Sequence, residues 1–543
     1  MTESKQAAGP EGHPLAIDPE LCRGCVVCMR ACPAKAIRVR RGVATIIPEL
    51  CVDCGVCFRA CPHGAIRLLS TPLDHIRRFA HPVATASPTI FSQFGYNVTP
   101  NQILLALKRV GFEQVVDISL ICEMTAVAME EYLLAHPGAR PGISPLCPVV
   151  VKLITKRFPS LIEHVIPVPS PRMLAAKTIK DELAARRGWK KEDIGVFIIS
   201  PCVAKIAGDR ESHSSHLDGF ICIHEVYQPI LQALKDVSED CFIHQESGRG
   251  LAWAMSGGQA EAFEESYTLS VSGFEEVVSI LEMVEGGRLA ELSFIEPHIC
   301  QGGCVGGPLT VENRYRARSV VRHLIRRYGY YSRVDRSLVR HKMRQGFFDW
   351  GMELEPRPLP ALAQDPSRAI ERLKRINQLL DRLPGSQCGL CGSPDCATFA
   401  QDVIQGTARE EDCPALAASK GLPATSNVKD NMTVRDIAEQ LNLEVAAGSE
   451  GLDRQVQGGY ISDLLSDVIA NAPAGCLWLT VQNHANSVAV AVLKDLAALC
   501  LVGGRRPQED SAAKADQEKL PILLSPDDAY TLAGRLHELG LGR

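Results

Sequence analysis

The chain lacks three features that would each assign it to a class of protein. Charge of one sign is not in excess, since 58 lysine and arginine residues face 63 aspartate and glutamate residues. This balance excludes a strongly basic nucleic-acid-binding protein and a strongly acidic tail protein. No run reaches the roughly 18 uninterrupted apolar residues of a membrane helix, because Lys494 and Asp495 interrupt the best candidate, 488–502. Residues 1–12 are polar and do not resemble a signal peptide. We expect a cytoplasmic protein without a membrane span.

Length and cysteine content say what is present instead. At about 150 residues per domain, 543 residues predict three or four domains. A composition of 46% hydrophobic and 22% charged residues can bury ordinary cores. Most of the 21 cysteines lie in groups. In a reducing cytosol, grouped cysteines are more typical of metal ligands or catalysts than of disulfides.

One cysteine pattern occurs twice near the N-terminus. Each copy reads Cys-x-x-Cys-x-x-Cys-x-x-x-Cys-Pro, and the copies comprise Cys22, Cys25, Cys28 and Cys32, then Cys51, Cys54, Cys57 and Cys61. Three closely spaced thiolates can hold three corners of a [4Fe–4S] cubane, and the fourth ligand comes from the other copy in two-cluster ferredoxins. One predicted cluster therefore has Cys22, Cys25, Cys28 and Cys61 as ligands, and the other has Cys51, Cys54, Cys57 and Cys32. Zinc is the alternative, although zinc sites favour paired ligands with a longer gap. Residues 13–71 resemble bacterial two-cluster ferredoxins.

The next segment, 72–355, alternates helical and strand-like patterns. Helices are expected at 101–110 and 125–134, and strands at 114–118 and 194–199, which favours an α/β domain. Its cysteines lie in three motifs, which contain Cys147, Cys202, and the pair Cys300 and Cys304. Separate cysteines often act as small hydrophobic residues. The glycines around the last pair nevertheless permit close approach of backbone to a bulky inorganic core.

In this order behind a ferredoxin module, the three motifs resemble those of the catalytic domain of [FeFe]-hydrogenases. The resemblance implies that the [4Fe–4S] part of an H-cluster is held by Cys147, Cys202, Cys300 and Cys304. It implies further that Cys304 bridges to a two-iron subsite and that Lys205 hydrogen-bonds a cyanide of that subsite. Ser170 matches a serine of the family's proton route.

The sequence departs from this family at several positions. Leu146 replaces a cysteine that shuttles protons, and a leucine has no proton to give. Ser200 and His298 replace methionines. Glu131 matches the outer carboxylate of the proton route, but Leu134 stands three residues further on. The cubane is expected to be retained, whereas the two-iron subsite is left open. The candidate catalytic residues are Lys205 and His298. His298 is either a ligand or proton donor, or a hydrogen-bonded filler.

A third cysteine group follows a proline-rich linker, 355–365, and a predicted helix, 366–382. It comprises Cys388, Cys391, Cys396 and Cys413. Residues 366–420 resemble the small [4Fe–4S] domain of corrinoid iron–sulfur proteins and of an electron-transport subunit. A fourth cubane is therefore predicted here, with zinc as the alternative.

The tail, 430–543, shows βαβ alternation that begins at a capping box, Thr433 to Asp436. Residues 458–467 resemble part of the DRTGG domain, which is usually regulatory. Asp463, Asp467 and His484 either line a ligand site or serve as caps and solvated groups, and we favour the second interpretation.

Two features remain outside these modules. Buried packing is expected for Cys122, Cys222, Cys241, Cys476 and Cys500. The segment 314–344 carries eleven lysine and arginine residues with tyrosines between them. It is interpreted as a solvated helical face that offsets cluster charge or docks an acidic partner, rather than as a nucleic-acid site, because the chain as a whole is acidic.

The sequence thus predicts a multidomain α/β protein: an α+β ferredoxin module, an α/β hydrogenase-like core, a small Fe–S domain and a βαβ regulatory domain. Four [4Fe–4S] clusters are expected, two ferredoxin-type, one H-cluster-type and one C-terminal. We expect a redox protein for redox or hydrogen sensing. The alternatives are a slow [FeFe]-hydrogenase oxidising or producing H2 and a non-catalytic cluster-binding scaffold. Expected partners are a ferredoxin or a flavin- or NADH-linked subunit, and a signalling protein at the C-terminal domain.

Overall fold

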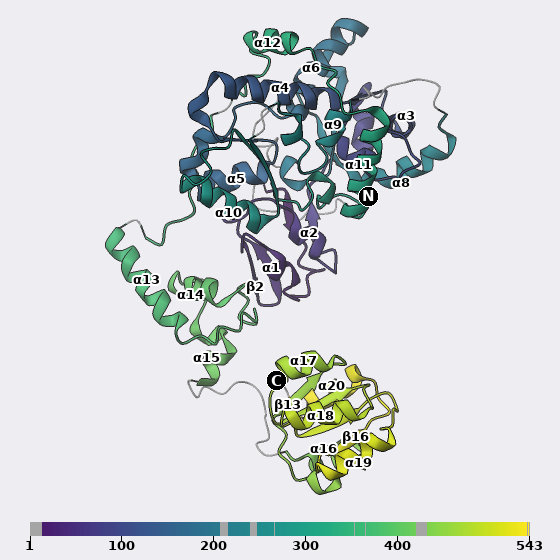
Figure 1. Cartoon of the computed structure of the whole chain (residues 1–543), viewed down its shortest axis with the longest axis vertical. Helices are drawn as coiled ribbons and strands as arrows, with labels where there is room; N and C mark the ends of the chain where they lie inside the picture. Colours follow the sequence, from purple (N-terminus) through teal and green to yellow (C-terminus); the bar gives the residue numbers. More distant parts are fainter. Residues whose placement is uncertain are drawn as a thin grey trace. The chain divides into compact units, whose positions relative to one another are not determined.

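A computed structural model describes residues 13–206, 216–238, 247–264, 267–351, 353–363, 365–419, 432–539 and 541. The chain forms two compact units, Met1–Cys413 and Pro414–Arg543 (Figure 1). Within the part of the chain that the structure describes, no helix is long and apolar enough to cross a membrane.

The N-terminal module is built from two similar halves. Each half contributes a short helix that ends one residue before the last cysteine of its motif, and these helices are α1 (Val27–Ala31) and α2 (Val56–Ala60). Two antiparallel strand pairs flank them: β1 (Leu15–Ile17) with β4 (Ile66–Leu68), and β2 (Ile37–Arg40) with β3 (Val43–Ile46). The internal duplication of the sequence is therefore visible as a duplicated fold.

The core of the larger unit is a parallel sheet with the order β6-β5-β8-β9. Its strands are β5 (His81–Ala86), β6 (Gln114–Asp117), β8 (Ile194–Ser200) and β9 (Gly219–Cys222). All residues of β8 are buried, as is typical of a strand in a parallel sheet covered on both faces. The helices between and beside these strands are α3 (Pro100–Val110), α4 (Ser119–Ala135), α6 (Pro171–Arg187), α8 (Ile223–Ala233) and α9 (Gly248–Ala252). The α/β prediction is confirmed.

A second parallel sheet has the order β10-β11-β7. It consists of β7 (Gly142–Ile143), β10 (Thr268–Ser272) and β11 (Phe294–His298), with α5 (Pro148–Arg157) and α10 (Phe274–Glu285) packed nearby. Ile143 pairs with Ile295, so the carboxyl ends of β7 and β11 lie at one edge. Cys147 and Cys300 follow these two strands, which brings their loops together.

The basic segment forms α11 (Arg314–Tyr328) and α12 (Arg336–Arg344). Ala317, Val320, Val321 and Leu324 are the buried residues of α11, so the helix packs against the core along an apolar stripe. Beyond it, α13 (Pro366–Leu380) and α14 (Cys396–Ile404) pack together (Figure 1). Of the third cysteine group, Cys388 and Cys391 lie between these helices, Cys396 begins α14 and Cys413 follows it.

The second unit begins at α15 (Pro414–Ser419) and contains a five-stranded sheet with the order β12-β16-β15-β14-β13. The strands are β12 (Glu444–Ala447), β13 (Gly458–Ile461), β14 (Cys476–Thr480), β15 (Ala498–Leu501) and β16 (Ile522–Leu524). The helices are α16 (Val434–Leu441), α17 (Leu465–Asn471), α18 (Ala485–Leu493), α19 (Glu509–Gln517) and α20 (Ala529–Glu538). Four strands are parallel and only β12 pairs antiparallel, and the capping box at Thr433 is present.

The polar residues singled out in the second unit have local partners. Asp463 accepts hydrogen bonds from Thr480 Oγ1 and the Val481 amide, both at 2.9 Å. Asp467 accepts one from the Tyr460 hydroxyl at 2.8 Å. His484 Nε2 lies 2.9 Å from Gln482 Oε1. These contacts support the interpretation as caps and local bridges.

Candidate iron–sulfur centres

The four cysteines of the middle segment arrive at one place from three loops. Cys147 precedes α5, Cys202 follows β8, and Cys300 and Cys304 follow β11. Burial and the charges of Cys202, Cys147 and Cys304 raise the pKa of Cys300, so these four thiols lie within electrostatic range of one another. A set of four enclosed thiols fits a [4Fe–4S] cubane.

Two cationic side chains act on Cys304. Lys205 Nζ lies 3.6 Å from Cys304 Sγ, and His298 also hydrogen-bonds this sulfur. Burial raises the pKa of Cys304, but Lys205 and His298 outweigh burial and lower it to about 6. Cys304 is therefore a thiolate at neutral pH, the form that binds metal.

His298 is fixed by a buried carboxylate. Its Nε2 lies 2.8 Å from Glu296 Oε1. Glu296 Oε2 in turn accepts hydrogen bonds from the amides of Gln259 and Ala260 at 3.1 and 2.8 Å. Burial lowers the pKa of His298, but Cys304 and Glu296 raise it to about 9. His298 is thus hydrogen-bonded, as one of the two interpretations expected. Its partners are Glu296 and Cys304, and Cys304 is a candidate cluster ligand.

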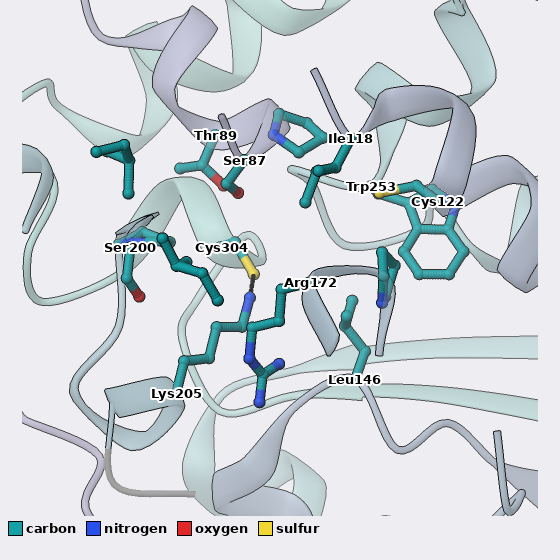
Figure 2. A pocket seen from close by; sticks show the side chains of 15 residues that line it. Ser87, Thr89, Ile118, Cys122, Leu146, Arg172, Ser200, Lys205, Trp253 and Cys304 are labelled. Atoms are coloured by element: carbon teal, nitrogen blue, oxygen red, sulfur yellow. Dashed lines mark hydrogen bonds between the residues drawn. The ribbon is translucent and has the colours of Figure 1, made fainter. Parts of the chain in front are cut away.

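A small cavity of about 30 Å³ adjoins Cys304 (Figure 2). Lys205 points into it toward Cys304, with Arg172 beside it. The other labelled lining residues are Ser87, Thr89, Ile118, Cys122, Leu146, Ser200 and Trp253. Leu146 and Ser200 therefore occupy the cavity where the resemblance implies a cysteine and a methionine.

Arg172 is a cavity residue that sequence reasoning missed. Burial lowers the pKa of Lys205, and so does the charge of Arg172, but the charges of Cys304 and Cys202 outweigh both and raise it. Arg172 is buried and lies in the first turn of α6. A single arginine after Ser170-Pro171 looks like any surface charge in the sequence, so only the fold could identify it.

Neither carboxylate position of the expected proton route, Glu131 or Leu134, provides a free carboxylate. Arg340 Nε donates a hydrogen bond to Glu131 Oε2 at 2.8 Å, and Arg336 Nη2 donates one to Oε1 at 2.9 Å. These arginines keep the pKa of Glu131 below its usual value. Leu134 is exposed. Ser170 precedes α6, and its hydroxyl is buried without a hydrogen-bond partner among the described residues. Glu131 is therefore a paired anion in this fold.

The structure brings together the crossed ligand sets of the N-terminal module. Burial and the charges of Cys22, Cys61 and Cys25 raise the pKa of Cys28 to about 11. Burial raises the pKa of Cys54 to about 12, and the neighbouring charges of Cys32 and Cys51 act in the same direction. Cys61 thus lies with the first copy and Cys32 with the second.

Neighbouring thiol sets approach one another. The charge of Cys28 is among those that raise the pKa of Cys57, and the charge of Cys54 is among those that raise the pKa of Cys300. The module also packs tightly on the core at Gly55, where an added Cβ would lie 2.7 Å from Val203 Cγ2. The second N-terminal set therefore lies next to the core set.

A buried polar group beside Cys51 was not predicted. His13 Nε2 lies 3.2 Å from Asp53 Oδ1, and Lys152 Nζ lies 2.7 Å from Asp53 Oδ2. Burial raises the pKa of Asp53, but His13 and Lys152 hold it below the usual value. His13, Cys51 and Asp53 are close enough to hold a metal ion. Because Asp53 is already paired with two cations, we interpret the group as an ion-pair network that anchors the Cys51 loop.

The third cysteine group is attached to the N-terminal module. Burial, Cys413 and Cys388 raise the pKa of Cys391, and Cys396 is the first residue of α14. Arg30 and Arg40 donate hydrogen bonds to the carbonyl oxygens of Cys388 and Cys391. This group therefore lies next to the first N-terminal set.

Of the remaining cysteines, four are buried as expected: Cys122, Cys222, Cys476 and Cys500. Cys122 also lines the cavity beside Cys304. Cys241 lies outside the described residues.

These cysteine sets fit iron–sulfur clusters, and the family comparisons agree with them. Residues 14–62 match the model of the 4Fe-4S dicluster domain, and residues 383–415 match that of an Fe-S cluster family. Residues 80–270 match "Iron only hydrogenase large subunit, C-terminal domain". The chain is thus a hydrogenase-like protein that binds iron–sulfur clusters, which confirms the coarse part of the sequence prediction.

Individual relatives are distant. Iron hydrogenase 1 of Clostridium pasteurianum is 24% identical over 290 residues, covering 44% of this chain and 50% of that protein. The match therefore spans half of that relative. Among solved structures, an [FeFe]-hydrogenase, HydA1, of Chlamydomonas reinhardtii gives a TM-score of 0.39 at 18% identity, covering 53% of this chain and 93% of that one. The CBS and DRTGG domains of a Clostridium perfringens pyrophosphatase give a TM-score of 0.17 at 18% identity, covering 20% and 46%.

Proposed function

We propose that the protein is a redox device in which four [4Fe–4S] sites form a series that ends at the hydrogenase-like core, whose state reports redox conditions or hydrogen. The observation that carries the proposal is the series of approaches between thiol sets: Cys388–Cys413 to the first N-terminal set, Cys28 to Cys57, and Cys54 to Cys300. When bound, [4Fe–4S] clusters supply one-electron transfer. The chain's part is to hold these ligand sets next to one another in a fixed order.

The cavity residues favour sensing over rapid turnover. Leu146 lines the cavity and cannot exchange a proton, and Glu131 is held by two arginines. Lys205 and His298 keep Cys304 ionised for metal binding. Both side chains are buried away from solvent. The proposed partners are a ferredoxin or a flavin- or NADH-linked subunit as electron donor, and a signalling protein at the second unit.

A slow [FeFe]-hydrogenase is the second candidate. The cavity beside Cys304 favours it, because Lys205 is directed at Cys304, the residue that the resemblance makes the bridge to a two-iron subsite. Turnover would then be limited by proton delivery past Leu146.

The test is an infrared spectrum of the full chain produced with hydrogenase maturation factors, followed by redox titration of its clusters. Reversible reduction of all clusters without carbon monoxide and cyanide bands supports a redox sensor that lacks the two-iron subsite. Those bands, together with hydrogen turnover that rises in Leu146→Cys but not in Leu133→Cys, establish the slow hydrogenase. Leu133 is a matched control because it is buried and does not line the cavity. Clusters that cannot be reduced reversibly contradict both candidates and leave a scaffold.

A further inference from the structure

The start of α11 lines a second cavity that the proposed redox function does not use. This cleft encloses about 400 Å³ and is bounded by Arg314 and Arg318 of α11, by Ser256, and by Ser270 and Ser272 of β10. Gly302, which lies between Cys300 and Cys304, also lines the cleft. The basic segment is therefore more than a solvated face.

The two arginines give the cleft a positive character. They are four residues apart on one helix and so lie on the same side. Arg318 is half-buried, and its Nε is fully buried without a hydrogen-bond partner among the described residues. Within the described chain, no carboxylate forms an ion pair with either guanidinium. Two guanidiniums that line one cleft without a carboxylate partner among the described residues favour an anionic ligand in it.

The arginine at the mouth is held in place. Arg314 Nη2 donates a hydrogen bond to the Tyr315 hydroxyl at 3.1 Å, and its guanidinium lies 4.9 Å from the centre of the Tyr315 ring. Glu261, the acidic residue that lines the cleft, is exposed, so solvent screens its charge. The net charge presented to a ligand is positive.

Neutral hydrogen-bond groups complete the wall. Ser256 Oγ and Ser270 Oγ are 2.8 Å apart. Ser272 Oγ accepts a hydrogen bond from the Gly302 amide at 3.2 Å and keeps its own proton to donate. At Gly302 a Cβ would meet no atom within 4 Å, so the wall is open on the ligand side. Hydroxyl donors facing two guanidiniums suit an oxyanion.

We propose that this cleft binds a small oxyanion, a carboxylate or a phosphate, through Arg314, Arg318 and the Ser272 hydroxyl. The ligand would rest against the loop that supplies Cys300 and Cys304, because the Ser256 amide donates to the Gly302 carbonyl at 3.0 Å and Ser272 accepts from the Gly302 amide. The cleft is thus a regulatory site on the core. This regulatory role rests on the proposed redox function, whereas anion binding itself does not.

The experiment is isothermal titration of the cluster-loaded full chain with inorganic phosphate and, separately, with malonate at constant ionic strength. We expect saturable binding of at least one anion, weakened about tenfold or more in Arg318→Gln because a charge-assisted hydrogen bond is lost. Arg318→Lys should fall between the wild type and Arg318→Gln, since it keeps the charge but not the planar fork. Arg326→Gln is the matched control, because Arg326 is exposed on the same helix and its removal changes the net charge equally.

Tighter phosphate binding would assign a phosphate ligand, and tighter malonate binding a carboxylate. No saturable heat with either anion, or equal affinities for the wild type and Arg318→Gln, would overturn the proposal. Arg318→Lys and circular dichroism of each variant separate loss of binding from loss of fold. Because the readout is binding, clusters that fail to reduce reversibly would contradict the proposed function and leave this site standing.

Discussion

Arg38 and Asp402 form a buried two-point ion pair between residues 364 positions apart in the chain, with 2.5 Å from Nε to Oδ2 and 2.9 Å from Nη2 to Oδ1. Ser393 Oγ donates a further hydrogen bond to Asp402 Oδ2 at 2.6 Å, and Arg40 Nη2 lies 3.2 Å from the same oxygen. Asp402 is only 4% exposed. This pair attaches the small iron–sulfur module to the N-terminal module and keeps their cysteine sets adjacent.

Substitution of Asp402 should release the small module. In Asp402→Asn, Arg38 is left buried without its counter-charge, and breaking a buried pair in this way costs about 3–5 kcal/mol. We expect the free energy of unfolding to fall by that order and the linker 355–365 to become sensitive to protease. Glu411→Gln, an exposed change of equal charge in the same module, should leave both measurements unchanged. Equal behaviour of the two variants would show that the pair does not hold the module.

Crossed ligation predicts which cluster each N-terminal cysteine supports. Cys61→Ser should disturb the cluster site of Cys22, Cys25 and Cys28, because Cys61 acts on Cys28. Cys32→Ser should disturb the other site, because Cys32 acts on Cys54 and Cys57.

Iron analysis and electron paramagnetic resonance of each variant check this assignment. Each change should remove or alter one cubane signal, and the two variants should affect different signals. Cys500→Ser, a change at a buried cysteine of the second unit, should keep full iron content. If both N-terminal variants alter the same signal, the ligands are not crossed.

The buried group at His13 predicts a pH-dependent stability. Burial lowers the pKa of His13, but its interactions with Asp53 and Cys51 raise it from 6.5 to about 10. Folding therefore favours the protonated form, so the stabilisation is complete below pH 6.5 and is lost as the pH rises through about 10.

This prediction is checked by chemical denaturation of the wild type and His13→Asn across that pH range. The difference in free energy of unfolding should be largest at the acidic end and shrink toward the alkaline end. His63→Asn, at an exposed histidine of the same module, should show no such trend. A difference that grows with pH would reverse the sign and contradict the assigned charge state.

Local pattern predicted most elements, whereas long-range pairs had to be observed. The cysteine spacing indicated both N-terminal sets, and the capping box at Thr433 indicated the start of α16, since both depend on neighbours along the chain. The partner of Asp402 and the cavity position of Arg172 depend on residues hundreds of positions apart or on packing of separate loops. Sequence alone gives no register between such segments. His298 shows the middle case: its presence was visible, but its bond to Glu296 required the strand geometry of β11.

Two adjacent glycines in the Cys300–Cys304 loop should respond very differently to alanine. Both have a positive φ, +82° at Gly302 and +92° at Gly303, so either alanine would incur roughly 1–2 kcal/mol of backbone strain. At Gly303, however, the new Cβ would lie 2.3 Å from the Ser256 amide nitrogen and 2.6 Å from the Met255 carbonyl carbon, and backbone atoms cannot move aside as a side chain can.

We therefore expect Gly303→Ala to cost about 1–3 kcal/mol more than Gly302→Ala in free energy of unfolding, as overpacking does in cores. The forced shift displaces Cys304 from Lys205, so iron bound at the core site should fall in Gly303→Ala and remain near the wild-type amount in Gly302→Ala. Denaturation and iron analysis of the two purified variants measure both effects. Equal losses would mean that strain alone acts in this loop and that its contact with Ser256 does not position Cys304.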